Sequence, residues 1–439
     1  MYCCAIRPFV LLLGLFVPAF AQTTYLQRYL AASTGVYLWV SDNNLVNDNL
    51  YRITAPGQST LLATVPGGNV QGMAEVNGIV VTQMLCDSCP GLLRTDGSVG
   101  GTYFLPALTG LGILGSPLSG TALNGFVYFL GSDGTQYGGL FRTDGTVVNE
   151  VASLTPASIL AVYGLQALGG KLYLRVLNTG ALLEIFSSTG DAGSSFNLVT
   201  TLPNNNLVWY GPPTWIELLG SNLVFDVVGP GTGVTIFTAP AAGGAASILS
   251  QTNQGYSDLA ALIGSKIFMR LYNNANGGEL WVSDGTAGGT GMVKDLAPGP
   301  GSSTPTDFVE FNNLCYFLAD NSPLAFPSGF FSSDGTNSGT KAVYNPRGQG
   351  STIGLRQVNG RLFFFAPASA RGGYQLAVSD GTPGGTKPVN IGAFVSQGLN
   401  DVWIQVSGGL YYFNYATSTA NNIYRTDGTP AGTVLLGQF

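Results

Sequence analysis

One short sequence recurs along this chain at a near-constant spacing, and it constrains the fold more than any other feature. Its fullest copy is Glu279–Thr290, which reads ELWVSDGTAGGT. Five shorter copies keep the core (Ser/Thr)-Asp-Gly-(Thr/Ser), with the aspartate at positions 96, 144, 334, 380 and 427. Matching the flanking apolar residues places Thr54, Thr189 and Ala239 in the aspartate position of three further copies. The nine copies lie 42 to 50 residues apart, a period typical of solenoids, propellers and arrays.

Each repeat reads as four short strands separated by turn residues. In the seventh repeat these runs are 308–311, 314–318, 329–332 and 341–344, which are rich in aromatic and apolar residues. Asn-Gly at 77–78, 124–125 and 359–360 is expected to close the first hairpin, because a two-residue turn needs positive φ. The Asp-Gly-Thr segment is expected to join the third strand to the fourth. Its aspartate is predicted to be structural, with the side chain accepting hydrogen bonds from its own turn.

We therefore predict an all-β protein with a single β-propeller of about nine four-stranded repeats, occupying residues 22–439 with a period of about 47 residues. The alternative is eight blades plus a degenerate cap formed by the first repeat, because nine blades exceed the usual range. The first strand is expected near 25–30 and the last at 433–436. No strand would then be exchanged to lock the ring, and closure would depend on packing between repeats 9 and 1.

The fullest copy, continued through Met292–Gly299, resembles the ELWxxDGT repeat of secreted bacterial proteins. The other aspartate-bearing copies keep the Asp-Gly core but replace Glu-Leu-Trp, and repeats 1, 4 and 5 lose the aspartate. The resemblance implies an exported, propeller-like repeat protein. It supplies no catalytic residues to carry over.

Residues 1–21 are expected to be a secretory signal peptide. Arg7 supplies its positive charge, 10–17 its apolar core, and Ala19-Phe20-Ala21 its cleavage site. We predict cleavage after Ala21 and a mature chain that is secreted, either extracellular or at the cell surface. The alternative is a short membrane anchor, but the apolar run is too short to span a bilayer comfortably. No transmembrane segment is expected in the mature chain.

Composition limits the chemistry that this chain can perform. The sequence contains no histidine, which removes Ser-His-Asp and Cys-His arrangements and His-ligated zinc. Carboxylate, tyrosine and lysine chemistry remain, and no cofactor or metal site is predicted. The net charge of −6 argues against a nucleic-acid partner, since phosphate binding requires an excess of clustered Lys and Arg.

Cys86 and Cys89 have CxxC spacing in a loop flanked by proline and glycine. Without a second cysteine pair or a histidine, they supply only two of the four ligands of a structural zinc site. We predict a disulfide that staples this loop, with free thiols as the alternative.

A polar residue recurs in the first strand of several repeats, three residues before the turn glycine or in the matching place. The set is Glu75, Gln166, Glu217, Glu310, Gln357 and Gln405. The first strand of a propeller blade is innermost, so these side chains are predicted to line the channel. Glu217 and Glu310 are candidates for a glycosidase acid and nucleophile, but a whole repeat separates them and such carboxyls stand roughly 5–9.5 Å apart. Hydrogen bonding to neighbouring backbone is therefore the favoured role.

Arginine lies two residues before the aspartate position in repeats 1, 2, 3 and 9, at Arg52, Arg94, Arg142 and Arg425. These repeats are contiguous only if the ring closes. The four guanidinium groups would then form an arc suited to an anionic partner such as an acidic glycan. In the alternative, each arginine pairs with an aspartate of its own or the neighbouring blade.

Alternating strand direction places the first–second and third–fourth turns on one face and the other connections on the opposite face. The second–third connections vary in length and side chain, at 42–49, 84–91, 131–139, 272–278, 319–329 and 414–422. Binding residues tend to lie on such loops. We predict a binding or interaction module for an extracellular glycan or protein rather than an enzyme. The alternatives are an extracellular carbohydrate-active enzyme using Asp, Glu or Tyr, and a structural matrix component.

Overall fold

The computed structural model describes residues 25–438, with several internal gaps. The gaps are 43–45, 86–90, 107–111, 115–121, 133–136, 154–158, 181, 203–213, 230–232, 253–254, 256, 321–327, 347–350, 369–372, 390–403 and 417–420. The expected signal peptide and the Cys86–Cys89 pair lie outside the described residues. Among the described residues, no helix is long and apolar enough to cross a membrane.

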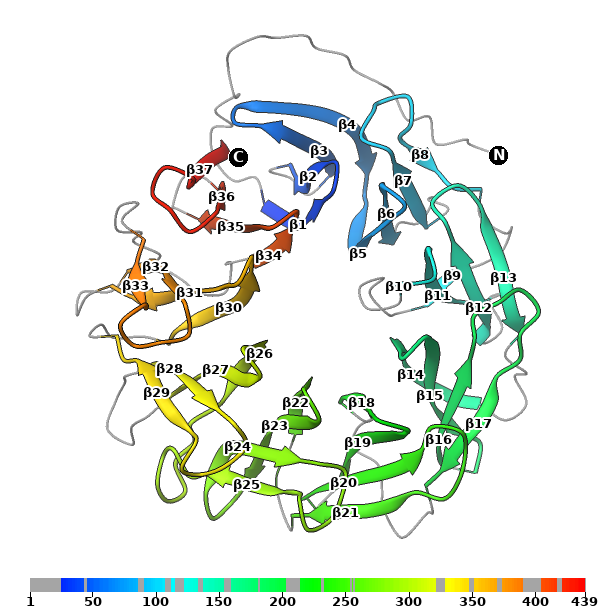
Figure 1. Ribbon diagram of the computed structural model, residues 1–439. Coiled ribbons are helices and arrows are strands. Elements are labelled where there is room, and N and C mark those ends of the chain that lie inside the picture. Colours follow the sequence, from blue (N-terminus) through cyan, green and yellow to red (C-terminus); the bar gives the residue numbers. More distant parts are fainter. Residues whose placement is uncertain are drawn as a thin grey trace.

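The strands form nine antiparallel sheets arranged in a ring around a central opening, so the protein is a nine-bladed β-propeller (Figure 1). Blade 1 contains β1 (Tyr25–Ala32), β2 (Gly35–Ser41), β3 (Asn47–Ala55) and β4 (Gln58–Pro66). Blade 2 contains β5 (Asn69–Val76), β6 (Ile79–Leu85), β7 (Leu92–Thr95) and β8 (Tyr103–Phe104). Blade 3 contains β9 (Gly112–Leu114), β10 (Ala122–Leu123), β11 (Phe126–Ser132), β12 (Tyr137–Thr143) and β13 (Val148–Ser153).

The next three blades continue the same order. Blade 4 contains β14 (Ile159–Leu168), β15 (Lys171–Asn178), β16 (Leu183–Ser188) and β17 (Asn197–Thr201). Blade 5 contains β18 (Ile216–Leu219), β19 (Asn222–Gly229), β20 (Gly233–Pro240) and β21 (Ser247–Gln251). Blade 6 contains β22 (Ser257–Ile263), β23 (Lys266–Asn273), β24 (Gly277–Ser283) and β25 (Gly291–Lys294).

The last three blades complete the ring. Blade 7 contains β26 (Thr306–Phe311), β27 (Leu314–Asp320), β28 (Ser328–Ser333) and β29 (Lys341–Tyr344). Blade 8 contains β30 (Ile353–Val358), β31 (Arg361–Pro367), β32 (Tyr374–Ser379) and β33 (Lys387–Pro388). Blade 9 contains β34 (Ile404–Ser407), β35 (Leu410–Ala416), β36 (Asn421–Thr426) and β37 (Val434–Gln438).

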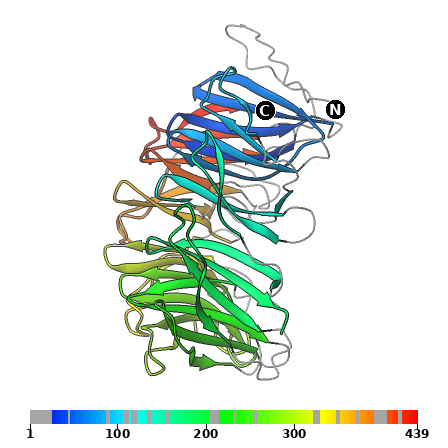
Figure 2. The same ribbon diagram turned by 90° about the vertical axis from the view of Figure 1, so that its right-hand side faces the viewer.

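Within each blade the strands pair in chain order, with the first strand innermost (Figure 1). Seen from its edge, the ring is a thick disc whose strands run across its thickness (Figure 2). Blade 3 departs from this pattern, because β9 and β10 both pair with β11 as two pieces of an inner strand.

Two residues separate the first strand from the second in every blade. The predicted Asn-Gly turns are confirmed: Asn77, Asn124 and Asn359 have φ of 51°, 51° and 47°. Their glycines also have positive φ, as the two-residue hairpin turn requires.

Nine buried hydrophobic clusters hold the ring together, and each draws its residues from two adjacent blades. Trp39 of blade 1 packs with Val80 and Leu93 of blade 2, for example. The core is therefore a series of nine seams, because side chains of a strand alternate between the two neighbouring blades.

The seam between blades 9 and 1 closes the ring without a shared strand. Ile423 and Leu436 of blade 9 pack with Tyr29, Val36 and other residues of blade 1. Gln405 accepts a hydrogen bond from the amide of Ala31 and donates one to the carbonyl of Tyr29 over 2.9 Å. The predicted closure by side-chain packing is confirmed, and blade 1 is a full blade, so the eight-blade alternative is wrong.

Candidate functional site

The Asp-Gly-Thr turn of blade 6 is a closed network of hydrogen bonds. Asp284 Oδ1 accepts from the amide of Thr286 over 2.9 Å and from its hydroxyl over 2.7 Å. The hydroxyl of Ser283 accepts from the amide of Gly285 over 3.1 Å. The hydroxyl of Thr290 donates to the carbonyl of Thr286 over 2.7 Å. The aspartate therefore shapes its own turn, as predicted from the sequence.

The same aspartate geometry recurs in five other blades, at Asp96, Asp144, Asp334, Asp380 and Asp427. Hydrogen bonds from the hydroxyl and amide of Thr286 lower the pKa of Asp284, because they favour the charged form. Among the described residues, no group of three or more Cys, Asp or Glu side chains is placed to hold a metal ion.

The second glycine of the motif is explained by the aspartate. A Cβ at Gly289 would collide with the carboxylate of Asp284, and the same holds for the equivalent glycines of blades 2, 7, 8 and 9. The first glycine, Gly285, has φ of +86°, and a Cβ there would lie 3.1 Å from Cδ2 of Leu219 in blade 5. Both glycines are thus steric requirements of a turn pressed against the preceding blade.

The three turns without aspartate are held differently. Gly57 of blade 1 donates its amide to the carbonyl of Leu436 in blade 9 over 2.9 Å. Gly193 of blade 4 donates to Val151 of blade 3 over 3.2 Å, and Gly244 of blade 5 donates to Val199 of blade 4 over 2.9 Å. A backbone bond to the preceding blade therefore fixes each of these turns.

The six polar residues predicted to line the channel fall into two registers. Glu75, Glu310 and Gln357 stand two residues before the turn, whereas Gln166, Glu217 and Gln405 stand three residues before it. Since successive side chains of a strand point to opposite faces, the two groups face opposite neighbouring blades. In sequence, the repeats were aligned on the turn glycine, which occupies the second turn position in Asn77-Gly78 but was taken as the first in Gly169-Gly170. That alignment therefore placed both registers in one position.

Three members of this set bind the inner strand of a neighbouring blade or the turn that follows it. Glu75 accepts from the amide of Ser33 in blade 1 over 2.9 and 3.0 Å. Gln166 donates to the carbonyl of Ile216 in blade 5 over 3.3 Å, and Gln405 holds β1 as described above. These contacts match the favoured structural role, in which polar side chains satisfy neighbouring backbone.

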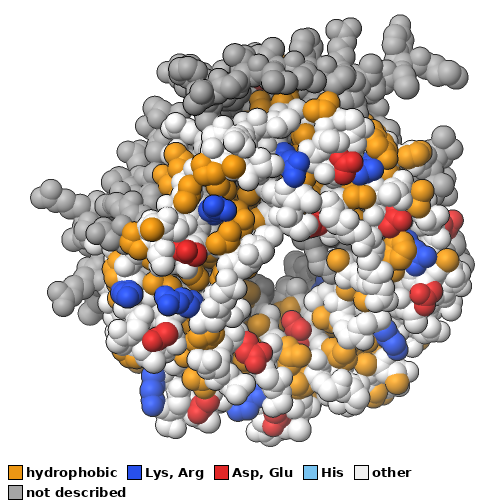
Figure 3. Space-filling model, turned by 45° about the horizontal axis from the view of Figure 1, so that its top comes forward, with side chains coloured by type: hydrophobic (Ala, Val, Ile, Leu, Met, Phe, Trp, Pro, Cys, Tyr) orange, Lys and Arg blue, Asp and Glu red, His pale blue; other side chains and the backbone are white. Residues whose placement is uncertain are grey.

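Glu217 and Glu310 belong to blades 5 and 7, with blade 6 between them. Glu217 is half-buried, and burial raises its pKa to about 7, whereas Glu310 and Gln357 are exposed. Figure 3 shows acidic side chains around the central opening. The blade between Glu217 and Glu310 keeps the acid and nucleophile pair the less favoured interpretation.

The four arginines make contacts with different parts of the ring. Arg52 donates to the carbonyl of Gly97 in blade 2 over 2.9 Å, and Arg142 donates to Gly190 in blade 4 over 2.9 Å. Arg94 stays within blade 2, and the charge of Arg425 lies near Tyr412 of its own blade. Two of the four are thus engaged in separate seams, and anion binding by the set stays a prediction.

Several buried charges were missed by the sequence analysis. Asp226 of β19 is 0% exposed and accepts from the amide and hydroxyl of Thr214 and the amide of Trp215. Burial raises its pKa to about 6, opposed by these bonds and by the charge of Arg175 in blade 4. Asp226 and Arg175 are each the single charged residue of an apolar run, in LVFDVVG and LYLRVLN, and this pattern is the signal by which the sequence could have revealed them.

Two further carboxylates tie the chain between blades. Glu279, which is 0% exposed, accepts from the amides of Leu296 and Ser303, each over 2.9 Å, and so holds the connection from blade 6 to blade 7. Asp307 of blade 7 accepts from Gly354 over 2.8 Å and pairs with Arg356 of blade 8 over 3.0 Å. The Glu of the ELW sequence is therefore also a structural residue.

Comparison with solved structures finds chains that are distantly similar to this one. A Mycobacterium tuberculosis puromycin-hydrolyzing peptidase aligns over 78% of this chain and 58% of its own, at 13% identity and a TM-score of 0.41. A structure from a study of two prolyl endopeptidases aligns over 92% and 54%, at 10% identity and a TM-score of 0.44. An uncharacterized Listeria monocytogenes protein aligns over 66% and 87%, at 10% identity and a TM-score of 0.40.

This chain therefore spans just over half the length of the two peptidase structures. No protein-family model matches the sequence, and no curated protein matches it either. The class that the fold defines is the β-propeller, and the resemblance to the ELWxxDGT repeat rests on the repeat residues themselves.

Proposed function

We propose that this protein is an exported binding module that recognises an extracellular glycan or protein through the face carrying the second–third and fourth–first connections. The observation that carries this proposal is a difference between the two faces. On one face, the first–second turn is two residues long in all nine blades. On the other, the fourth–first connection ranges from two residues after Pro66 to fifteen after Pro388.

We call the face with the first–second turns the constant face and the opposite one the variable face. The constant face also carries the third–fourth turns, which contain two to eight residues but are tied into the ring. Its third–fourth turns are fixed by their own aspartates or by amides that bond to the preceding blade. The second–third connections range from three residues before Gly233 to seven before Ser328. Variable connections on a rigid scaffold are where binding residues concentrate, so the variable face is the one that would recognise a partner.

Oriented attachment to a surface tests which face binds. A residue carrying an azide replaces either Ala275, exposed in a turn of the variable face, or Ser265, exposed in a turn of the constant face of the same blade. Each protein is then coupled to a sensor through that single point. Neutral and acidic soluble polysaccharides and purified extracellular matrix proteins serve as probes.

Binding should persist when the protein is attached through position 265 and fall when it is attached through position 275. Equal binding in both orientations, or stronger binding through position 275, would contradict the assignment of the face. Release of shortened saccharides from a bound polysaccharide would instead favour the enzyme, and binding only to other copies of this chain would favour the matrix component.

A further inference from the structure

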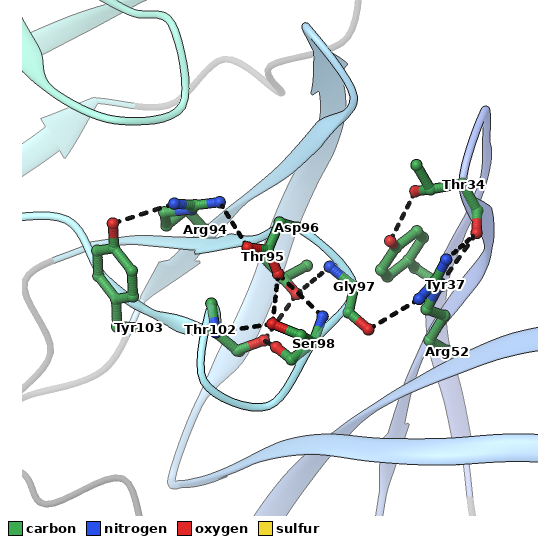
Figure 4. A network of polar contacts seen from close by, with 11 residues as sticks. Thr34, Tyr37, Arg52, Arg94, Thr95, Asp96, Gly97, Ser98, Thr102 and Tyr103 are labelled. Carbon is green, nitrogen blue, oxygen red and sulfur yellow. Dashed lines mark hydrogen bonds and ion pairs between the residues drawn. The ribbon is translucent and has the colours of Figure 1, made fainter.

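Blade 2 carries a cluster of an aromatic, a carboxylate and a guanidinium group at its outer edge (Figure 4). Arg94 of β7 donates from Nη1 to the hydroxyl of Tyr103 over 3.0 Å. Its Nη2 lies 3.6 Å from Oδ2 of Asp96, and its Cζ lies 5.0 Å from the centroid of the Tyr103 ring. We call these three residues the rim cluster.

The rim cluster combines a buried charge with exposed partners. The side chain of Arg94 is 9% exposed and that of Asp96 is 47% exposed. Tyr103 is 39% exposed, although it is a large aromatic residue. The guanidinium group is therefore held inside the blade, where it positions an exposed ring and an exposed carboxylate.

Among the four arginines in this position, only Arg94 has an aromatic partner on the fourth strand of its blade. Arg94 pairs there with Tyr103, whereas Arg52, Arg142 and Arg425 pair with Thr60, Asn149 and Val434. On the second strand the pattern is reversed: Arg94 pairs with Val81, and the other three pair with Tyr37, Tyr128 and Tyr412. The repeat alone does not require an aromatic residue at position 103, because the outer strands of blades 1, 3 and 9 form without one there.

Hydrogen-bonding capacity is left over in the rim cluster. Oδ1 of Asp96 accepts from the amide and hydroxyl of Ser98 over 2.9 and 2.7 Å, while the one contact of Oδ2 with the described residues is the longer one to Arg94. The Tyr103 hydroxyl accepts from Arg94, so its own proton remains available to donate. Nε of Arg94 is buried and has no hydrogen-bond partner among the described residues, a state that costs free energy unless a partner or water reaches it.

These groups match one kind of ligand. A flat ring offers apolar contact to the C–H face of a sugar, and a carboxylate beside a phenol offers an acceptor and a donor to neighbouring hydroxyls. The charges of Arg94 and Asp96 compensate each other, so a neutral ligand fits better than a charged one. Hydrogen bonds from Ser98 lower the pKa of Asp96, which keeps its carboxylate ionised as an acceptor at neutral pH.

We propose that the rim cluster binds a neutral pyranose unit of an extracellular polysaccharide, with the sugar ring stacked on Tyr103 and a hydroxyl donated to Oδ2 of Asp96. Arg94 is a positioning residue that orients both groups. This site lies beside a third–fourth turn, so it is separate from the variable face and does not depend on it.

Affinity measurements with a panel of soluble polysaccharides test the site. The neutral probes are a β-glucan, a galactomannan and a xylan, and the acidic probes are alginate and polygalacturonate. Tyr103→Ala removes the stacking surface. Asp96→Asn keeps an oxygen for Ser98 but removes the charge, and Asp144→Asn is its matched control in blade 3, where the residue opposite the arginine is Asn149.

Wild-type protein should bind at least one neutral probe more tightly than either acidic one. Tyr103→Ala should weaken that binding by about tenfold or more. Asp96→Asn should weaken it by about tenfold or more as well, because the amide nitrogen that takes the place of Oδ2 cannot accept a hydrogen bond from the sugar hydroxyl. Asp144→Asn should bind as wild type does. Thermal unfolding of each variant checks that the blade is intact.

Other results would overturn the rim site. Unchanged binding by a folded Tyr103→Ala protein would show that the sugar is bound elsewhere, and this outcome leaves the variable-face proposal standing. Failure of wild-type protein to bind any neutral probe, or equal losses in Asp96→Asn and Asp144→Asn, would remove the site as well.

Discussion

Blades 5 and 6 are neighbours in the ring, and their third–fourth turns are held in two different ways. In blade 6, Asp284 accepts two hydrogen bonds from Thr286 within the turn. In blade 5, the equivalent position is Ala239, and the amide of Gly244 instead bonds to the carbonyl of Val199 in blade 4. Both arrangements hold a turn in place at the edge of the preceding blade.

The difference shows what the aspartate does. Five of the six aspartate turns contain seven residues between their strands, at blades 2, 6, 7, 8 and 9, and that of blade 3 contains four, whereas the turns of blades 1, 4 and 5 contain two, eight and six. The aspartate together with the second glycine accompanies the seven-residue turn, and each turn without the aspartate reaches the preceding blade through its own backbone. Loss of the aspartate is therefore a change of anchoring and not a loss of the blade.

The largest effect is expected from Gly289→Ala, which places a methyl group against the carboxylate of Asp284. We expect a loss of about 1–3 kcal/mol in the free energy of unfolding, as for other overpacked sites, measured by urea denaturation. Gly288→Ala is the matched control, because a Cβ there has open space around it. In an Asp284→Ala background the cost of Gly289→Ala should largely disappear, and additive losses would contradict the steric explanation.

Asp284→Ala removes the carboxylate oxygen that accepts hydrogen bonds from the amide and the hydroxyl of Thr286. By analogy with a lost capping side chain, the cost should be about 0.5–2 kcal/mol. Asp284→Asn keeps the acceptor oxygen and should lose less. Addition of a chelator should leave the melting temperature of wild-type protein unchanged, and a sharp fall would mean that the aspartates hold ions instead.

The two blades should also differ in their response to pH. The pKa of Asp284 is lowered by its bonds to Thr286, so its contribution to stability is present above the unfolded pKa and is lost as the pH falls below about 4. Glu217 of blade 5 has a pKa raised by burial to about 7. The folded protein therefore loses stability at Glu217 as the pH rises from the pKa of this glutamate in the unfolded chain through about 7, because the charged form is disfavoured by burial.

Glu217→Gln tests the second half of this contrast. The variant should melt at a higher temperature than wild type at pH 8 and at nearly the same temperature at pH 4.5, with a gain reduced by solvent screening at this half-buried site. Glu310→Gln, at an exposed glutamate of blade 7, is the matched control for replacing an inner-strand carboxylate by an amide. A gain from Glu217→Gln that is equal at both pH values would contradict the assignment.

The smallest effect is expected from Thr189→Asp, which restores the aspartate to blade 4. That turn is already held by Gly193 and by a hydrogen bond between the hydroxyls of Ser188 and Ser194 over 2.8 Å. The residue two positions after the new aspartate is Asp191, which offers no hydroxyl and adds a like charge. The free energy of unfolding should change by less than about 0.5 kcal/mol. A clear gain would show that the two anchors are additive.

The repeat spacing and the turn residues were sufficient to predict the ring. Asn77-Gly78 and Asp284-Gly285 act locally, and their conformations follow from the residues themselves. The directions of the channel-side residues could not be predicted, because a shift of one residue reverses the face of a strand. Gln166 and Glu75 differ by such a shift, and only the strand pairing reveals it.

The candidate sites were predicted only in part for a related reason. Arg94 was recognised as one of four equivalent arginines, but its long side chain can turn towards its own blade or the next. Arg52 and Arg142 reach the next blade, whereas Arg94 turns to Tyr103. Arg94 is the one of these three with a tyrosine opposite it on the fourth strand, and that residue lies outside the repeat motif.

Each blade takes all of its strands from one continuous stretch of chain, and the seam that Gln405 completes is built like the others. The fold therefore does not require the chain to begin at any particular blade. A circular permutant that begins at β5 and ends at β4, with a short linker joining the original ends, should fold into the same propeller. For the same reason each repeat is a self-contained unit of sequence, so duplication or deletion of one continuous segment would add or remove one whole blade.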